Sequence, residues 1–249
     1  MKTVISIFFI FVFQIGQILS QEIKQGVVTY KVTDFEIEGK LSGEMSTDDA
    51  KELKGFMAPM IAELKQTIAW DEDSQYIEIN LAGILTNKIF TDLKKHQNIT
   101  YMDLMGQKYK IVSDIPPMNS AASSKKEFIS DSKIIAGYKC YKVVYSLVAP
   151  DFSRSIPEHS EKENRETNNV ELTAYITDLI KPSAYLSLIQ GTTLKGLPLE
   201  FNLSLQGMNL KLEATEVKTK VDKKLFIQPT GYQEMTIAEF EQMMAKLGK

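Results

Sequence analysis

The sequence predicts a mainly β protein with some α structure (the α+β class). We expect a curved antiparallel sheet, or incomplete β-barrel, that wraps an amphipathic helix, and a short C-terminal helix. The first observation is that segments of alternating apolar and polar residues recur about every ten residues, with turn residues between them. The second is that two segments have the three- and four-residue apolar spacing of helices. The 43% hydrophobic and 24% charged residues are typical of a globular chain.

Residues 1–20 have the composition of a secretory signal peptide. Lys2 precedes an apolar run from Val4 to Phe13, which is shorter than the roughly 20 residues of a membrane span. We expect cleavage between Ser20 and Gln21; a retained N-terminal anchor is the alternative. Residues 21–249 are then expected to form one exported domain, periplasmic or secreted, with no transmembrane segment in the mature chain.

Charge and cysteine usage narrow the classes of partner and compartment. Lys2 is the only charged residue of the leader, so its removal changes the net charge from −3 to −4. No stretch is both basic and aromatic, which argues against nucleic acid as a partner. Cys140 is the only cysteine, so an intramolecular disulfide is impossible and the core must hold without one. A bacterial periplasm suits such an exported protein.

The first elements are a strand and a long helix. Residues Gly26 to Val32 alternate, and a capping box of Ser46 and Asp49 then predicts a helix reaching about Ala69, kinked near Pro59. Its wide apolar stripe should pack on the concave side of the sheet, where it can be covered. The stripe comprises Leu53, Phe56, Met57, Met60, Ile61, Leu64 and Ile68.

Several strands follow. The predicted strands are Gln75–Leu81, Leu85–Leu93, Ile99–Met105, Gln107–Val112, Phe128–Ile135, Tyr138–Val148 and Val170–Thr177. The strands Phe128–Ile135 and Tyr138–Val148 form a hairpin about Ala136-Gly137. Prolines and small polar residues make 114–124 a loop, and the charged stretch 149–169 is a long exposed loop.

The clearest hairpin spans residues 196–217. Apolar residues occupy odd positions before Gly207-Met208 and even positions after it, which fits a two-residue turn at that dipeptide. The predicted register puts Leu205 opposite Leu210, Leu203 opposite Leu212 and Phe201 opposite Ala214. A one-residue slip would turn one strand's apolar side chains into water.

A short helix ends the chain. Thr236 and Glu239 have the spacing of a second capping box. The apolar stripe that follows is Ile237, Phe240, Met244 and Leu247.

No catalytic or metal-binding motif is present. The sequence lacks H-E-x-x-H, C-x-x-C, a nucleophile elbow and a phosphate loop, and His96 and His159 lie far apart. Cys140 lies within a strand and is interpreted as a small buried hydrophobe rather than a reactive thiolate. Asp71-Glu72-Asp73 is interpreted as a solvated turn rather than a cation site. We therefore expect no enzyme activity, no metal and no cofactor.

Four short motifs stand out in the second half of the chain: IIAGYKCYK (134–142), YITD (175–178), GLPLEF (196–201) and GYQEM (231–235). Together they resemble a family of uncharacterised bacterial envelope proteins related to the LolA/LolB-type lipoprotein carriers. The resemblance implies an incomplete antiparallel barrel that wraps a helix and holds lipid chains in an apolar cavity. The cavity arginine of some carriers has no counterpart, because Arg154 and Arg165 fall in the charged loop. That departure argues against lipoprotein cargo specifically.

The functional hypothesis is a carrier-like periplasmic protein that binds an apolar or lipidated ligand between sheet and helix, without catalysis. Acyl chains, a lipoprotein's among them, are the ligands considered. The alternative is a structural or protein-interaction module of the envelope, with a filled core and binding through its loops. Flexible methionines on the helix suit a wall for an acyl chain, although the same residues also suit ordinary core packing. The predicted cavity residues are Phe56, Met57, Met60, Ile61, Phe201, Leu203, Leu205, Leu210 and Leu212.

Overall fold

The computed structural model describes residues 23–37, 47–104, 106–115, 123–148, 169–180, 196–205 and 208–247. The expected signal peptide of residues 1–20, Ser46, His159, residues 206–207, residues 116–122 of the expected loop 114–124 and residues 149–168 of the expected loop 149–169 lie outside these ranges. Asp114, Ser123 and Ser124 belong to strands rather than to a loop. No helix within them combines the length and the apolar character that crossing a bilayer requires.

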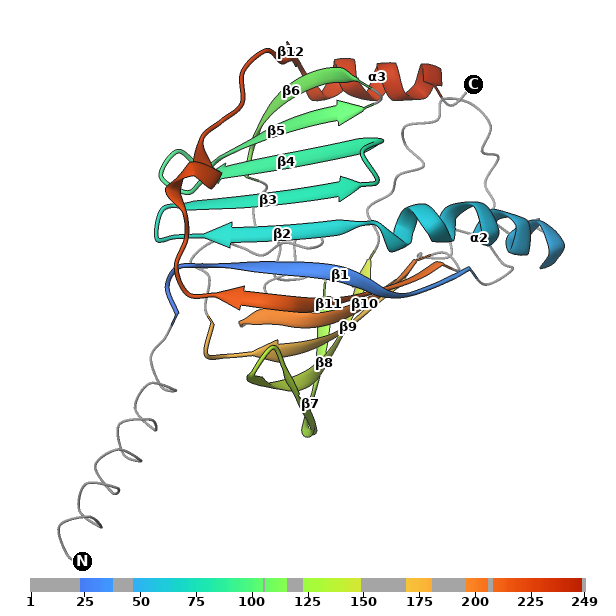
Figure 1. The fold of residues 1–249 in the computed structure, drawn as a ribbon, viewed down its shortest axis with the longest axis vertical. Coiled ribbons are helices and arrows are strands. Elements are labelled where there is room, and N and C mark those ends of the chain that lie inside the picture. The colour runs from blue at the N-terminus through green and yellow to red at the C-terminus, as the bar shows by residue number, and fades with distance from the viewer. Residues whose placement is uncertain are drawn as a thin grey trace, which may run out of the picture.

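The described residues form one open, curved sheet of 12 strands (Figure 1). Its strands are β1 (Gly26–Ile37), β2 (Lys65–Trp70), β3 (Ser74–Leu81), β4 (Leu85–Asp92), β5 (Gln97–Leu104), β6 (Gln107–Asp114), β7 (Ser123–Ile135), β8 (Tyr138–Val148), β9 (Asn169–Thr177), β10 (Leu197–Leu205), β11 (Met208–Lys218) and β12 (Gln233–Met235). The order across the sheet is β12-β6-β5-β4-β3-β2-β1-β11-β10-β9-β8-β7. All neighbours are antiparallel except β12, which lies parallel to β6. The predicted mainly β class with an incomplete barrel is confirmed.

The long helix is shorter than predicted. Helix α2 (Thr47–Ala62) ends seven residues before Ala69, and Lys65–Trp70 is strand β2 instead. The four-residue spacing of Leu64 and Ile68 fits a helix, but Gln66, Ile68 and Trp70 also alternate and are buried on one face. Because β2 pairs with both β1 and β3, these residues form a strand rather than the end of the helix.

Helix α2 does not lie across the sheet. Figure 1 shows it extending beyond the end of β2, alongside the last residues of β1. Lys54 of α2 forms an ion pair with Glu36 of β1 at 2.5 Å. No α2 side chain that the structure describes is buried, and Phe56 is 70% exposed. The expected covering of its stripe by the sheet is therefore not what the structure shows.

The β10–β11 hairpin is confirmed, but its predicted register is wrong by two residues. Leu205 pairs with Met208, Leu203 with Leu210 and Phe201 with Leu212. The two residues between the paired strands are therefore 206 and 207 rather than 207 and 208. A shift of two residues leaves every side chain on its original face, so the alternation could not distinguish the two registers.

Two other local predictions are confirmed. In the β7–β8 turn, Ala136 has φ 48° and Gly137 has φ 85°, as a type I′ turn requires. At the start of α3 (Ile237–Leu247), the Thr236 amide donates to Glu239 Oε2 at 2.7 Å. The Glu239 amide donates to Thr236 Oγ1 at 3.2 Å, which completes the capping box.

Apolar clusters pack on the two faces of the sheet. The larger joins β1, β2 and β8–β11, with Tyr30 and Ile68 at its centre, and we call its side the core face. Tyr30 Oη donates to the Pro198 carbonyl oxygen at 2.6 Å. The smaller cluster lies on the opposite face, where Tyr76, Phe90 and Tyr101 pack against residues that follow β11. Those residues include the 3-10 helix η3 (Lys223–Phe226), which contacts β3.

Candidate functional site: an apolar patch on the core face

The core face continues from β2 across β3–β6 as aligned rows of side chains. Directly paired residues of antiparallel strands project from the same face. One row runs Ile68, Ile77, Ile89, Thr100 and Ile111, and the next runs Gln66, Ile79, Asn87, Met102 and Tyr109. Apolar side chains thus extend from the packed centre of the molecule toward β6.

This face is more tightly packed on β1 and β2 than on β3–β6, although Ile111 of β6 is only 8% exposed. Val28, Tyr30 and Ile68, on β1 and β2, have no exposed surface. On β3–β6, by contrast, Ile79, Ile89, Met102 and Tyr109 are only half-buried, and neither core cluster includes them. We call these four residues the apolar patch; Ile77, which packs against the core cluster, forms its border. An apolar surface of this kind suits contact with an apolar partner.

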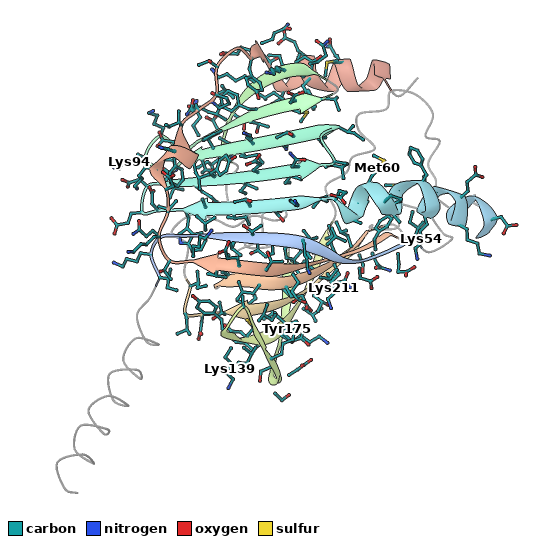
Figure 2. The ribbon with its side chains drawn as sticks, in the orientation of Figure 1. Lys54, Met60, Lys94, Lys139, Tyr175 and Lys211 are labelled. Atoms are coloured by element: carbon teal, nitrogen blue, oxygen red, sulfur yellow. The ribbon has the colours of Figure 1, made fainter. Side chains whose placement is uncertain are left out.

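The helical part of the predicted site lies outside the core cluster. Met57, Met60 and Ile61 are half-buried and Phe56 is exposed. Figure 2 shows Met60 and Lys54 projecting from opposite sides of α2. The described residues of the core cluster include none from α2.

The hairpin part of the predicted site belongs mainly to the core cluster. Phe201 is 6% exposed and Leu212 is 3% exposed, and Phe201 meets the Tyr30 ring edge-on at 5.6 Å between centroids. Leu203 and Leu210 are half-buried against the same cluster, and the side chain of Leu205 lies outside the described set. The link to α2 runs through β1, where Phe35 pairs with Leu210 and the adjacent Glu36 binds Lys54. Of the predicted residues whose side chains are described, those of the hairpin belong to the core cluster or pack against it, and those of α2 do not.

A second feature is a charged network around a buried carboxylate on β10. The Glu200 side chain is 6% exposed; its Oε2 lies 2.5 Å from Lys133 Nζ and its Oε1 lies 3.4 Å from Lys211 Nζ. Lys133 Nζ also sits 4.0 Å from the centre of the Tyr175 ring, and Tyr175 Oη donates to Asp131 at 3.1 Å. Figure 2 shows Tyr175 and Lys211 on this half of the sheet. The ammonium groups of Lys133 on β7 and Lys211 on β11 thus both contact the carboxylate on β10, which links the three strands.

The acidic stretch of residues 71–73 lies in a hydrogen-bonded turn between β2 and β3. Among the residues that the structure describes, no three His, Cys, Asp or Glu side chains are placed to hold a metal ion. Asp71 Oδ1 accepts from the amides of Asp73 and Ser74, and Asp71 Oδ2 lies 2.5 Å from Lys223 Nζ. These contacts close the β2–β3 turn. The interpretation of residues 71–73 as a turn agrees with this geometry.

Cys140 is expected to be unreactive in the folded protein. The side chain is fully buried, and burial raises the pKa of its thiol to about 11. At pH 8 the thiol is protonated, and it becomes available only on unfolding. Ellman's reagent should therefore label the native protein slowly and the denatured protein at once. Rapid labelling of the native protein would contradict the buried position.

The chain was compared with known proteins. No protein-family model and no curated protein matches it. Among solved structures it is similar to the Mycobacterium tuberculosis lipoprotein LppX, at 9% identity and a TM-score of 0.27, over 80% of this chain and 88% of that one. It is also similar to LprF from Mycobacterium bovis, at 11% identity and a TM-score of 0.29, over 86% and 96% of the two chains. TM-scores this low do not establish a shared fold.

Proposed function

We propose that the protein is an exported, non-catalytic carrier that binds an apolar or acyl ligand on the core face of its sheet. The observation that carries this proposal is the apolar patch of Ile79, Ile89, Met102 and Tyr109, which is only half-buried and continues the packed core. Burial of each ligand methylene against such a surface is worth about 0.8 kcal/mol, so affinity needs no reactive group. The ligand would therefore bind on the sheet surface over β3–β6, and not in a cavity between sheet and helix as the sequence led us to expect.

The exposed face of α2 favours a second candidate function, a protein-interaction module. Phe56 is 70% exposed, with the half-buried Met57 and Met60 close to it in the sequence. Aromatic and methionine side chains are enriched at protein interfaces. In this case a partner protein would cover α2, and the sheet would bind no small ligand.

Replacement of Ile89 by Asn tests the carrier function. We expect the variant to take up an apolar fluorophore such as N-phenyl-1-naphthylamine about ten-fold more weakly, which corresponds to the loss of roughly two buried methylene contacts. Ile84→Asn is the matched control, because Ile84 lies in the β3–β4 turn outside the patch and is 37% exposed. Fluorescence titration gives the affinities, and circular dichroism checks that both variants fold.

Native mass spectrometry and lipid extraction of protein purified from its own host complete the test. Co-purifying acyl species support the carrier function. A bare protein mass, combined with no fluorophore uptake by the wild type, contradicts it. Phe56→Asp separates the two candidates, since it should leave uptake unchanged in a carrier and abolish partner binding in an interaction module.

A further inference from the structure

The two ends of strands β2–β6 differ in charge. The β2–β3 and β4–β5 turns lie at one end and are joined by an exposed ion pair, in which Lys94 Nζ lies 2.7 Å from Asp73 Oδ2. The β3–β4 and β5–β6 turns lie at the other end, because each hairpin reverses the chain. Residues 81–85 and 104–107, which contain these two turns, include no charged side chain. We call this the apolar end of the sheet.

Helix α2 lies at the same end (Figure 1). Its residues 55–62 include no charged side chain. Phe56 and Met60 share a face of the helix, since they are four residues apart, and Phe56 is exposed. Figure 2 shows Met60 projecting beside the end of β3, on the side of α2 opposite to Lys54. Ile84, in the β3–β4 turn, is also exposed. Two separate segments thus present exposed apolar side chains at this end.

The apolar patch is continuous with the apolar end. Leu81, Leu85 and Leu104 are directly paired across β3, β4 and β5, and all three are half-buried. Leu81 and Leu104 lie two residues along their strands from the patch residues Ile79 and Met102, so they project from the same core face. The core face of β3–β5 therefore carries no charge between the patch and the apolar end.

We propose that the apolar end docks on a lipid bilayer, with Phe56 and Ile84 inserted among the lipids. An amphipathic helix can lie in the plane of a membrane interface, with its apolar face buried about 5–10 Å into the boundary between headgroups and acyl chains. The charged first half of α2 then stays in the headgroup layer. Docking in this way lets the apolar patch receive its ligand directly from the bilayer, and this last step rests on the carrier function proposed above.

The distribution of charge favours a bilayer over a protein partner. Moving a charged side chain toward hydrocarbon is costly, and the inserting segments have none. Protein interfaces, by contrast, have a polar rim and many direct hydrogen bonds. Glu63 and Lys65, at the junction of α2 and β2, are exposed charges of opposite sign. They fit a zwitterionic headgroup layer, which also carries both signs, so we expect no requirement for anionic lipid.

The test is flotation of the secreted form, residues 21–249, with phosphatidylcholine vesicles. The wild type should float with the vesicles at low and at high salt, because salt does not screen apolar insertion. Phe56→Asp and Ile84→Asp should each weaken binding about ten-fold, since each removes an apolar side chain from the lipid and adds a charge. Ile227→Asp is the matched control and should bind as the wild type does. Ile227 is 69% exposed, but it follows η3, which binds the β2–β3 turn at the opposite end.

Failure of the wild type to bind these vesicles overturns this inference and leaves α2 to a protein partner. The carrier function is tested separately, by fluorophore uptake without vesicles, which all three variants should retain. Binding that requires phosphatidylglycerol and disappears at high salt also overturns the inference, as does equal weakening by Ile227→Asp. A dimer that Phe56→Asp dissociates in analytical ultracentrifugation, without vesicle binding by the wild type, would assign the apolar end to a second copy of the chain instead. Circular dichroism checks that the variants fold.

Discussion

Gly196→Ala is expected to destabilise the protein by about 3–5 kcal/mol, combining backbone strain with a steric clash. Gly196 precedes β10 and has φ +116°, a conformation that side-chain-bearing residues rarely adopt. An added Cβ would lie 2.3 Å from the carbonyl oxygen of Thr177 and 2.9 Å from Ile176 Cγ2. The oxygen belongs to the backbone of β9, which pairs with β10, so it cannot move aside without disturbing the sheet. Urea denaturation gives the free energy of unfolding.

Gly137→Ala separates the clash from backbone strain alone. Gly137 also has a positive φ, +85°, but an added Cβ would meet nothing within 4 Å. Its substitution should cost only about 1–2 kcal/mol. Equal unfolding midpoints for the two variants would show that the close approach of β9 to Gly196 does not limit stability.

Lys133→Met is the second change with a large expected effect. It removes the ammonium group 2.5 Å from the buried Glu200 carboxylate and leaves only Lys211, at 3.4 Å. A buried charge that loses its main partner is costly, and we expect a loss of about 2–3 kcal/mol in the free energy of unfolding. The double variant Lys133→Met with Glu200→Gln should recover much of the loss, because the remaining amide is neutral.

Lys94→Met is the control for removing a lysine from an exposed ion pair. Lys94 Nζ lies 2.7 Å from Asp73 Oδ2, but the two side chains are 72% and 54% exposed. Its position in Figure 2 is far from Tyr175. The urea midpoint should not change measurably, since exposed pairs contribute little. If Lys133→Met behaves in the same way, the Glu200 network does not hold the strands together.

The alternation of apolar and polar residues predicted the strands well. It failed where a helix and a strand, or two strand registers, fit the same spacing of apolar residues. The alternation in residues 75–112 and 128–177 is confirmed as β3–β9 within two or three residues at most ends, although β7 begins five residues earlier than predicted. The predicted helix extended into β2 because Leu64 and Ile68, which are four residues apart, fit both the helical period and the two-residue period of a strand. The three residues of β12 are too few to show any period, and their strand state comes from pairing with β6.

The candidate site was less predictable than the fold, because burial depends on packing between distant segments. The hairpin's Phe201 and Leu212 have the alternation of a lining, yet both are buried in the core cluster, where Tyr30 of β1 packs against Phe201. The half-buried patch residues carry the same kind of alternation, and nothing in their own strands shows that they stay open. Glu200 occupies a polar position in the alternation of β10, and its burial depends on Lys133 from β7 together with Lys211 from β11.

The pairing of β1 with β11 has a consequence for the order of assembly. Strands β2–β6 are joined by consecutive hairpins, but β1 completes its pairing only with β11, where Val27 lies opposite Lys218. Contacts between such distant segments carry a large loop-closure cost and slow folding. The chain therefore cannot close its central seam until nearly all of it has been synthesised. Pairing of β1 with β11 is therefore expected to be among the last steps of folding.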